Sequence, residues 1–277
     1  MGAATGLIAT VDLATYRCSC GALFRECQFW NDIELRTRSL GHPVNVFQTN
    51  FWNTHLRLSP NRLVNAILIR SLRWDLLNAA RDAVIWRVPK VTRAISEMAW
   101  NTWSLASAVL EKTGKKVFVD TARDHQRPKY LATHPLLDVR VIHLIRDPRG
   151  NSASIMKHQG VDVTRAGRLW KHYNVEAARV RRSLPRESWM SLHYEELCAD
   201  PAGVFVRISD FLGIERPTAQ PASGSQEHHL IGNSMRLKGV TEIREDVSWQ
   251  TRLSDAEQAL LARIVGSTSH SLGYQWP

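Results

Sequence analysis

The feature that most constrains the fold is a change of hydrophobic period after residue 112. Apolar residues over 53–112 recur at three-and-four spacing, whereas 115–120 (KKVFVD) and 139–145 (VRVIHLI) are short β-branched runs. A third run of this kind, 188–194 (SWMSLHY), follows later, and helical patterns separate the runs. Strands alternating with helices predict an α/β fold with a parallel sheet covered by helices on both faces.

The helical segments carry their own boundary signals. Long helical patterns cover 53–112 and 165–184. Asp200 and Gly213 are suited to cap the two ends of the helix DPAGVFVRISDFL. Further boundary signals come from a proline at a helix start, Pro128, and from a capping box formed by Ser254 and Glu257.

Composition indicates a globular chain and limits its partners. The 277 residues are 44% hydrophobic and 22% charged, with a net charge of +10 that would suit an anionic ligand. The basic residues are scattered and no nucleic-acid motif is present, so we expect no nucleic-acid partner. No apolar run approaches the roughly 20 residues of a membrane helix, and the start MGAATGLIATVDL lacks a basic n-region. We therefore expect a single cytoplasmic domain over 1–277, of unknown oligomeric state.

Three of the four cysteines lie within CSCGALFREC, at Cys18, Cys20 and Cys27. The paired C-x-x-C spacing of many zinc sites is missing and no histidine is nearby in sequence, so we predict no metal site. A disulfide such as Cys20–Cys27 stays open for an oxidising compartment, with reduced structural cysteines as the alternative. His228 and His229, far along the chain, are expected to be structural.

Residues 139–145 end where a ligand would bind. Ligands of parallel sheets sit at the carboxyl ends of the strands, and here Arg146 is followed by DPRGNSAS. We predict Asn151 as the N-cap of the next helix, after Gly150 has turned the chain, which places Ser154 in the first turn. A start at the preceding proline would put Ser154 two turns in. With Asn151 as the cap, a guanidinium, a hydroxyl and free amides form a phosphate pocket; the alternative is a structural pair of Arg146 with Asp147 or another carboxylate.

An arginine that ends a strand, followed by Asp-Pro and by a serine eight positions after the arginine, resembles the 3′-phosphate-binding motif of the sulfotransferases. These enzymes use 3′-phosphoadenosine 5′-phosphosulfate (PAPS). The resemblance runs from about residue 8 to the end, because CSCGALFRECQFW, VFVDTARDHQRPKYL, VIHLIRDPRG, LHYEELCADP and RLKG…DVSWQTRLS keep the order seen in bacterial and carbohydrate-type members. It implies a P-loop NTPase-like fold.

The resemblance also implies cofactor contacts. Arg146 and Ser154 would hold the 3′-phosphate, and Tyr194 would lie near the adenine, where an aromatic face is suitable. The RLKG segment resembles the late basic loop of the family, which closes on the same phosphate. Its contacting residues would be Arg236, Lys238 and Gly239.

Sulfuryl transfer needs a general base for the proton of the acceptor. By resemblance the candidates are Asp12, ranked first, His125 and Asp124. Arg123 stands where relatives often carry a lysine, and it would contact the sulfate.

One family signature is absent from the sequence. No string of the form G-x-P-[KR]-S-G-T-[ST] and no Walker pattern occurs in it. GLIATVDL resembles the segment after that loop, so the resemblance implies a chain that lacks the first strand and the P-loop. A misplaced start methionine and a degenerate copy are the two explanations, and a missing N-terminus could also hide a targeting segment.

The expected function is sulfuryl transfer from PAPS to the hydroxyl or amine of a small-molecule or carbohydrate acceptor, without a metal. Residues 53–112 would form the acceptor side and 115–277 the cofactor side. The chain as given would be inactive if truncated. The alternative function is a non-catalytic degenerate paralogue or a basic protein that binds polyanions or nucleotides.

Overall fold

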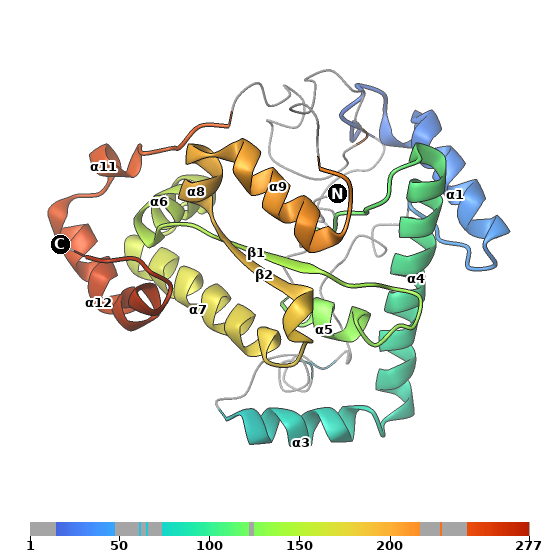
Figure 1. Cartoon of the computed structure of the whole chain (residues 1–277), viewed down its shortest axis with the longest axis horizontal. Helices are drawn as coiled ribbons and strands as arrows, with labels where there is room; N and C mark the ends of the chain where they lie inside the picture. Colours follow the sequence, from blue (N-terminus) through green and yellow to red (C-terminus); the bar gives the residue numbers. More distant parts are fainter. Residues whose placement is uncertain are drawn as a thin grey trace. The chain divides into compact units, whose positions relative to one another are not determined.

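The computed structural model describes residues 15–47, 61, 65, 74–121, 125–216, 228 and 243–276. The chain divides into two compact units. Figure 1 labels its helices and strands in chain order. Unit 1 comprises Met1–Val139 and Pro221–Thr241, and unit 2 comprises Arg140–Gln220 and Glu242–Pro277. The assignment of the whole chain to one domain stays a prediction.

The described part of unit 1 is built from helices. They are η2 (Phe24–Glu26), α1 (Gln28–Ser39), α3 (Asp75–Ile85), α4 (Pro89–Thr113) and α5 (Arg127–Leu131). α3 and α4 confirm the predicted helical stretch where it is described; α4 starts with Pro89 in its first turn and ends at Gly114 with φ of 64°. No described helix, including the 25-residue α4, is long and apolar enough to cross a membrane.

Two apolar clusters hold unit 1 together. In the first, Trp30 and Ile33 of α1 are fully buried with Leu105 and Ala108 of α4. The second packs α3, α4 and α5 through Ile85, Val91, Ile95 and Tyr130. Burial of such side chains stabilises each unit by about 1.5–3 kcal/mol per large residue.

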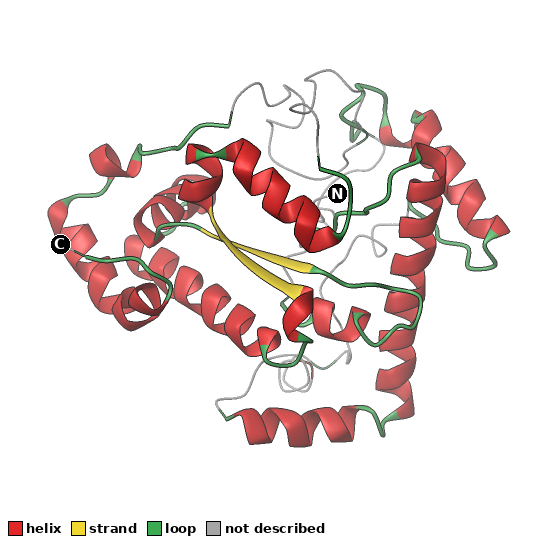
Figure 2. Cartoon of the chain, in the orientation of Figure 1, coloured by secondary structure: helices red, strands yellow, loops and turns green. Residues whose placement is uncertain are grey.

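Unit 2 contains the strands, drawn in yellow in Figure 2. Its elements are β1 (Val141–Ile145), α6 (Pro148–Gln159), α7 (Val163–Arg181), η3 (Arg186–Ser188), β2 (Trp189–His193), α8 (Tyr194–Ala199), α9 (Pro201–Leu212), α11 (Trp249–Arg252) and α12 (Asp255–Ser271). Two of the three predicted strands are therefore confirmed, as is the long helix predicted over 165–184.

β1 and β2 are parallel neighbours, with Val141 opposite Trp189 and Ile145 opposite His193. α6 and α7 connect them, so the predicted α/β arrangement with a parallel sheet is confirmed. The core beside β1 is formed by Ile145 together with residues of α6, α7 and α12, namely Ala153, Trp170, Leu261 and Val265. This packing fixes the carboxyl end of β1, where the chain continues into Arg146.

The predicted caps of unit 2 are present. Asp200 accepts a hydrogen bond from the backbone of Gly203, and α9 stops at Gly213 with φ of 65°. Ser254 and Glu257 form a reciprocal capping box at α12. Each of these signals acts over three or four residues, which is why sequence reasoning found them.

The strand predicted over 115–120 is wrong, because these residues form no strand in the structure. In the described part of the chain the sheet has two strands, β1 and β2, both in unit 2. A strand is defined by its ladder to a neighbour, and 115–120 has none among the described residues. Val119 accordingly remains 59% exposed.

Candidate functional site

The candidate site lies at the carboxyl ends of β1 and β2. Because Ile145 pairs with His193, the next residue of each strand is brought to the same edge, and these residues are Arg146 and Tyr194. The guanidinium carbon of Arg146 lies 4.6 Å from the centroid of the Tyr194 ring. Trp170 of α7 donates its indole N–H to the backbone carbonyl of Arg146 at 2.9 Å, which anchors the residue that follows the strand.

The helix after Arg146 starts earlier than its sequence predicts. α6 begins at Pro148, and Asp147 is the N-cap, since its carboxylate accepts the backbone N–H of Arg149 at 2.7 Å. The predicted cap at Asn151 is wrong: its N–H already donates to the carbonyl of Asp147. Proline has no N–H to satisfy and a φ that suits the first helical position, so Asp-Pro starts the helix before asparagine can. Ser154 therefore lies in the second turn of α6.

Gly150 gives Arg146 room rather than turning the chain. It has helical backbone geometry within α6. A Cβ built on it would lie 2.9 Å from Nε and 3.1 Å from Nη2 of Arg146, so a side chain there would have to displace the guanidinium. Ser154 is four residues further along the helix, hence on the same face, and helical side chains tilt toward the N-terminus. The Arg146 side chain therefore packs on the face of α6 that carries Ser154, although the N-cap predicted at Asn151 was wrong.

Asp246 is the present partner of Arg146. Nη2 of Arg146 donates to the backbone carbonyl of Asp246 at 2.8 Å and lies 3.4 Å from its Oδ2. Hydrogen bonds from Ser248, and then the Arg146 guanidinium, hold the pKa of Asp246 at about 2. The hydroxyl of Tyr194 accepts the N–H of Asp246 and donates to the carbonyl of Arg244. The chain over 244–246 is therefore fastened to both site residues.

Asp147 is not the partner of Arg146; the structural alternative is instead met by another carboxylate, that of Asp246. It pairs with the guanidinium of Arg149, at 2.6 Å to Nη2 and 3.0 Å to Nε. This bond raises the pKa of Arg149. Arg149 in turn stacks on Trp249 at 4.4 Å and Trp276 at 5.4 Å, measured from its Cζ to the ring centroids. With Asp147 neutralised by Arg149, Arg146 is left to other anions.

Glu195 joins three parts of unit 2 behind the site. Its Oε1 accepts the backbone N–H of Asp147 at 2.8 Å, and its Oε2 accepts the hydroxyl of Tyr274 at 2.8 Å. Burial and the Glu195 carboxylate raise the pKa of Tyr274 well above its usual range. Sequence reasoning missed this role, although Glu195 lies beside Tyr194 in YEEL.

Of the catalytic candidates the structure describes one, His125, which is partly buried in the turn before α5 in unit 1. Its role as a base stays a prediction. Arg127 donates to Asp120 at 3.0 Å and to Thr102 at 2.8 Å. Asp120 and Arg127 flank residues 121–126, which include three of the catalytic candidates, so their bond joins the two ends of that stretch. The predicted residues outside the described part of the chain are Asp12, Arg123, Asp124, Arg236, Lys238 and Gly239.

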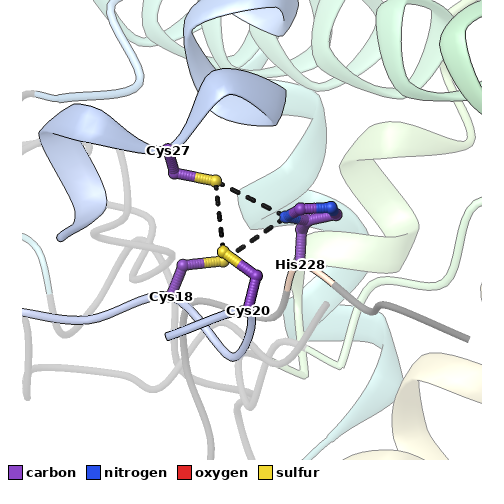
Figure 3. Close-up of side chains that lie close together, drawn as sticks. All are labelled: Cys18, Cys20, Cys27 and His228. Atoms are coloured by element: carbon purple, nitrogen blue, oxygen red, sulfur yellow. Dashed lines mark hydrogen bonds between the residues drawn. The ribbon is translucent and has the colours of Figure 1, made fainter. Parts of the chain in front are cut away.

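The thiol cluster of unit 1 contains a histidine, which corrects the prediction that none accompanies it. Nδ1 of His228 lies 3.7 Å from Sγ of Cys18 and 3.4 Å from Sγ of Cys27, and the Sγ atoms of Cys20 and Cys27 are 3.7 Å apart (Figure 3). All four cysteines of the chain are unlinked thiols. His228 is 201 residues from Cys27 in sequence, which is why local spacing gave no sign of it.

The environment of these thiols is part buried. Burial raises the pKa of the Cys18 thiol and raises that of Cys27 to about 12. Burial acts upward on Cys20 too, but hydrogen bonds from the backbone of Ala22 and from the neighbouring thiols outweigh it, so its pKa is lowered. The backbone at Cys20 and Trp30 acts in the lowering direction on the pKa of Cys18 and Cys27, respectively, but burial outweighs it.

Comparison with known proteins identifies the family. The profile described as "Sulfotransferase family" matches residues 70–218, which is more than half of the chain. The chain belongs to this family, as its sequence motifs predicted. The matched stretch includes β1, Arg146, α6 and Tyr194, so the site described above lies within it.

The chain is also similar to individual sulfotransferases. Mouse carbohydrate sulfotransferase 1 is 27% identical over 166 residues, which cover 48% of this chain and 40% of that protein. Two solved structures are also similar to this chain. The sulfotransferase domain from the curacin biosynthetic pathway is 15% identical with a TM-score of 0.44, and the match covers 72% of this chain and 75% of that one. The sulfotransferase domain from the Synechococcus PCC 7002 olefin synthase is 20% identical with a TM-score of 0.47, and the match covers 98% of this chain and 90% of that one. The chain thus spans less than half of the mouse relative.

Proposed function

We propose that this protein is a sulfotransferase that moves a sulfuryl group from PAPS to a hydroxyl or amine of a small-molecule or carbohydrate acceptor. The observation that carries the proposal is the arrangement of Arg146 over Gly150 and Tyr194, on the face of α6 that also bears Ser154. In a member of this family, such a cluster is suited to hold the 3′-phosphate of the cofactor.

The described residues fit a phosphate. Arg146 is a planar donor that binds phosphate through two parallel hydrogen bonds, and its side chain is only 18% exposed, so water competes weakly. Gly150 leaves the space that the guanidinium fills. Ser154, four residues further along α6, would add a hydroxyl donor on the same face. A bound phosphate would take the place of the Asp246 carboxylate, which is 50% exposed and held at 3.4 Å.

PAPS would supply the sulfuryl group and its leaving phosphate. Among the chain's own residues, Tyr194 would offer its ring to the adenine, and Arg236, Lys238 and Gly239 would close over the 3′-phosphate. The proton of the acceptor would pass to Asp12, His125 or Asp124, while Arg123 would contact the sulfate. The helices of unit 1, including α3 and α4, would form much of the acceptor side.

Calorimetric binding of adenosine 3′,5′-bisphosphate tests the pocket. Arg146→Ala should weaken binding by about 1.5–3 kcal/mol, the range for hydrogen bonds to charged groups, and Ser154→Ala should weaken it less. Arg140→Ala is the matched control, because Arg140 precedes the opposite end of β1 and donates to the carbonyl of Glu187. Unchanged affinity in both site variants would refute the assignment.

Sulfuryl transfer is then measured directly with radiolabelled PAPS and a mixed panel of acceptors. Turnover that falls with Arg146→Ala and not with Arg140→Ala supports the proposal. Binding of the bisphosphate without turnover under any condition would instead identify a nucleotide-binding protein of the same family.

A further inference from the structure

The thiol cluster of unit 1 has no part in the proposed sulfuryl transfer. It brings together two segments of the chain. The first is the hairpin that carries Cys18 and Cys20 and continues to Cys27 at the start of α1, and the second contributes His228. The four ligand-type atoms, three Sγ and one Nδ1, all lie within 4.8 Å of one another. Figure 3 shows the three sulfurs and the imidazole nitrogen directed toward a common centre.

The spacing of these atoms matches a tetrahedral metal site. A tetrahedral zinc ion with bonds of about 2.3 Å to sulfur and 2.0 Å to nitrogen keeps its ligand atoms about 3.5–3.8 Å apart. The observed separations are 3.4 Å for Cys27 to His228, 3.7 Å for Cys18 to His228, and 3.7 Å for Cys20 to Cys27. The remaining separations stay within 4.8 Å, so the four groups converge on one small volume.

We infer that Cys18, Cys20, Cys27 and His228 form a structural Zn²⁺ site of the Cys₃His type. Four protein ligands close the coordination sphere, so the ion holds the fold together and leaves no position for a substrate. Soft thiolates with one imidazole select zinc over the hard cations magnesium and calcium. On binding, each ligating thiol releases its proton to solvent.

The surroundings orient the ligands independently of an ion. The imidazole of His228 stacks on the ring of Phe29 of α1, with centroids 4.4 Å apart and planes 2° from parallel. The backbone that carries the thiols is also fixed, since the N–H of Cys18 donates to the carbonyl of Ala22 and the N–H of Trp30 to the carbonyl of Cys27, both at 3.0 Å.

The hairpin that carries the first two ligands is itself well fixed. Its two arms meet at an isolated antiparallel bridge between Arg17 and Leu23. Gly21 at the turn has φ of 89°, a conformation that favours glycine, and its carbonyl accepts a 2.7 Å hydrogen bond from Arg17. The sequence Cys-Gly therefore turns the chain so that Cys18 and Cys20 face the same centre.

A disulfide between Cys20 and Cys27 accounts for less of the geometry. It would need the sulfurs at about 2.05 Å, whereas they are 3.7 Å apart. A disulfide would also involve only two of the four convergent groups, and it would not explain why Cys18 and His228 lie beside them. A metal ion uses all four at the distances observed.

The ion would restrain a long stretch of chain. It would close a loop of 201 residues between Cys27 and His228, and the entropy lost from the unfolded chain grows with loop length. His228 also lies eight residues before Arg236 in sequence, so the site would anchor the chain near the predicted basic loop.

The test is metal analysis of the full chain, purified without a metal-binding tag and dialysed against metal-free buffer. We expect about one zinc per chain, as in closed four-ligand sites. Cys18→Ser, Cys27→Ser and His228→Ala should lose the ion, and Cys198→Ser, in α8 of unit 2, should keep it. His228→Cys should also keep it, because a thiolate can replace the imidazole, and this rescue separates ligation from a packing role.

Two further readouts cover variants that fold poorly. Titration of metal-stripped wild-type chain with Co²⁺ should give the visible and thiolate charge-transfer bands of a tetrahedral site, and these should shift in His228→Cys. Removal of zinc should lower the melting temperature, and added zinc should restore it. A reduced wild-type chain that takes up neither zinc nor Co²⁺, or a peptide map showing a Cys20–Cys27 disulfide in the native protein, overturns the proposal.

Discussion

The Arg146 guanidinium stacks on the ring of Tyr194, 4.6 Å from its centroid, although the two residues are 48 positions apart in sequence. Their contact is a consequence of strand register, since Ile145 pairs with His193 and each residue directly follows its strand. A cation over an aromatic face contributes about 0.5–2 kcal/mol, depending on exposure. Gly150 and Asp246 are the immediate neighbours of Arg146 in this pair.

Gly150→Ala should weaken ligand binding without unfolding the protein. The added methyl would lie 2.9 Å from Nε of Arg146 and must displace the guanidinium, while alanine itself favours a helix. We expect a loss of about 1–2 kcal/mol in binding of adenosine 3′,5′-bisphosphate, a part of what charged hydrogen bonds supply. Gly266→Ala in α12 is the control, because nothing lies within 4 Å of its added Cβ. Equal affinities of the two variants would contradict the role given to Gly150.

Asp246→Asn should strengthen phosphate binding. The change removes a carboxylate that competes for Arg146 and keeps a side chain able to bond Ser248. Because the carboxylate is half exposed, we expect a gain of up to about 1 kcal/mol at low salt. Asp210→Asn, which alters net charge equally at the exposed Arg216 pair, should leave affinity unchanged. Weaker binding by Asp246→Asn would mean that the carboxylate helps to build the pocket.

Acid should remove the stabilising effect of Asp246. Its pKa is lowered from 3.8 to about 2 in the folded protein, so the folded state favours the charged form. The contribution of the Asp246 carboxylate to the free energy of unfolding is therefore complete above about pH 4 and is lost as the pH falls toward 2. Solvent screening keeps it below about 1 kcal/mol. Chemical unfolding of wild type and Asp246→Asn should differ at pH 6 and converge near pH 2; an unchanged difference would contradict the pairing.

Glu195→Ala should destabilise unit 2 more than Glu196→Ala. Loss of Glu195 leaves the N–H of Asp147 and the hydroxyl of Tyr274 without their acceptor, at a cost of about 1–3 kcal/mol for each buried group. Glu196 pairs with Arg207 on the exposed surface, where an ion pair contributes about 0–1 kcal/mol. Urea unfolding of the two variants measures the difference, and similar midpoints would show that the Glu195 bridge is dispensable.

The sequence predicted the elements whose signals are local. The caps at Asp200 and Ser254 and the helices between β1 and β2 depend on contacts within a few residues. The two strands were predicted from their short β-branched runs, although the ladder that joins them is long-range. Family motifs then pointed to Arg146, whose role as a phosphate ligand stays a prediction. The same local reasoning failed at Asn151, because two capping signals lay close together and Asp-Pro came first.

Tertiary structure decided the partners. Asp246 is 100 residues from Arg146, and His228 is 201 residues from Cys27, so no spacing rule links them. The strand predicted at 115–120 is likewise a matter of long-range pairing, and no ladder joins it to another segment in the described part of the chain. Capping and periodicity act through the bonds of one short segment and can be read from its residues. Ion pairs, ligand clusters and sheet edges depend on where packing brings distant segments, and that is fixed only when the whole chain has folded.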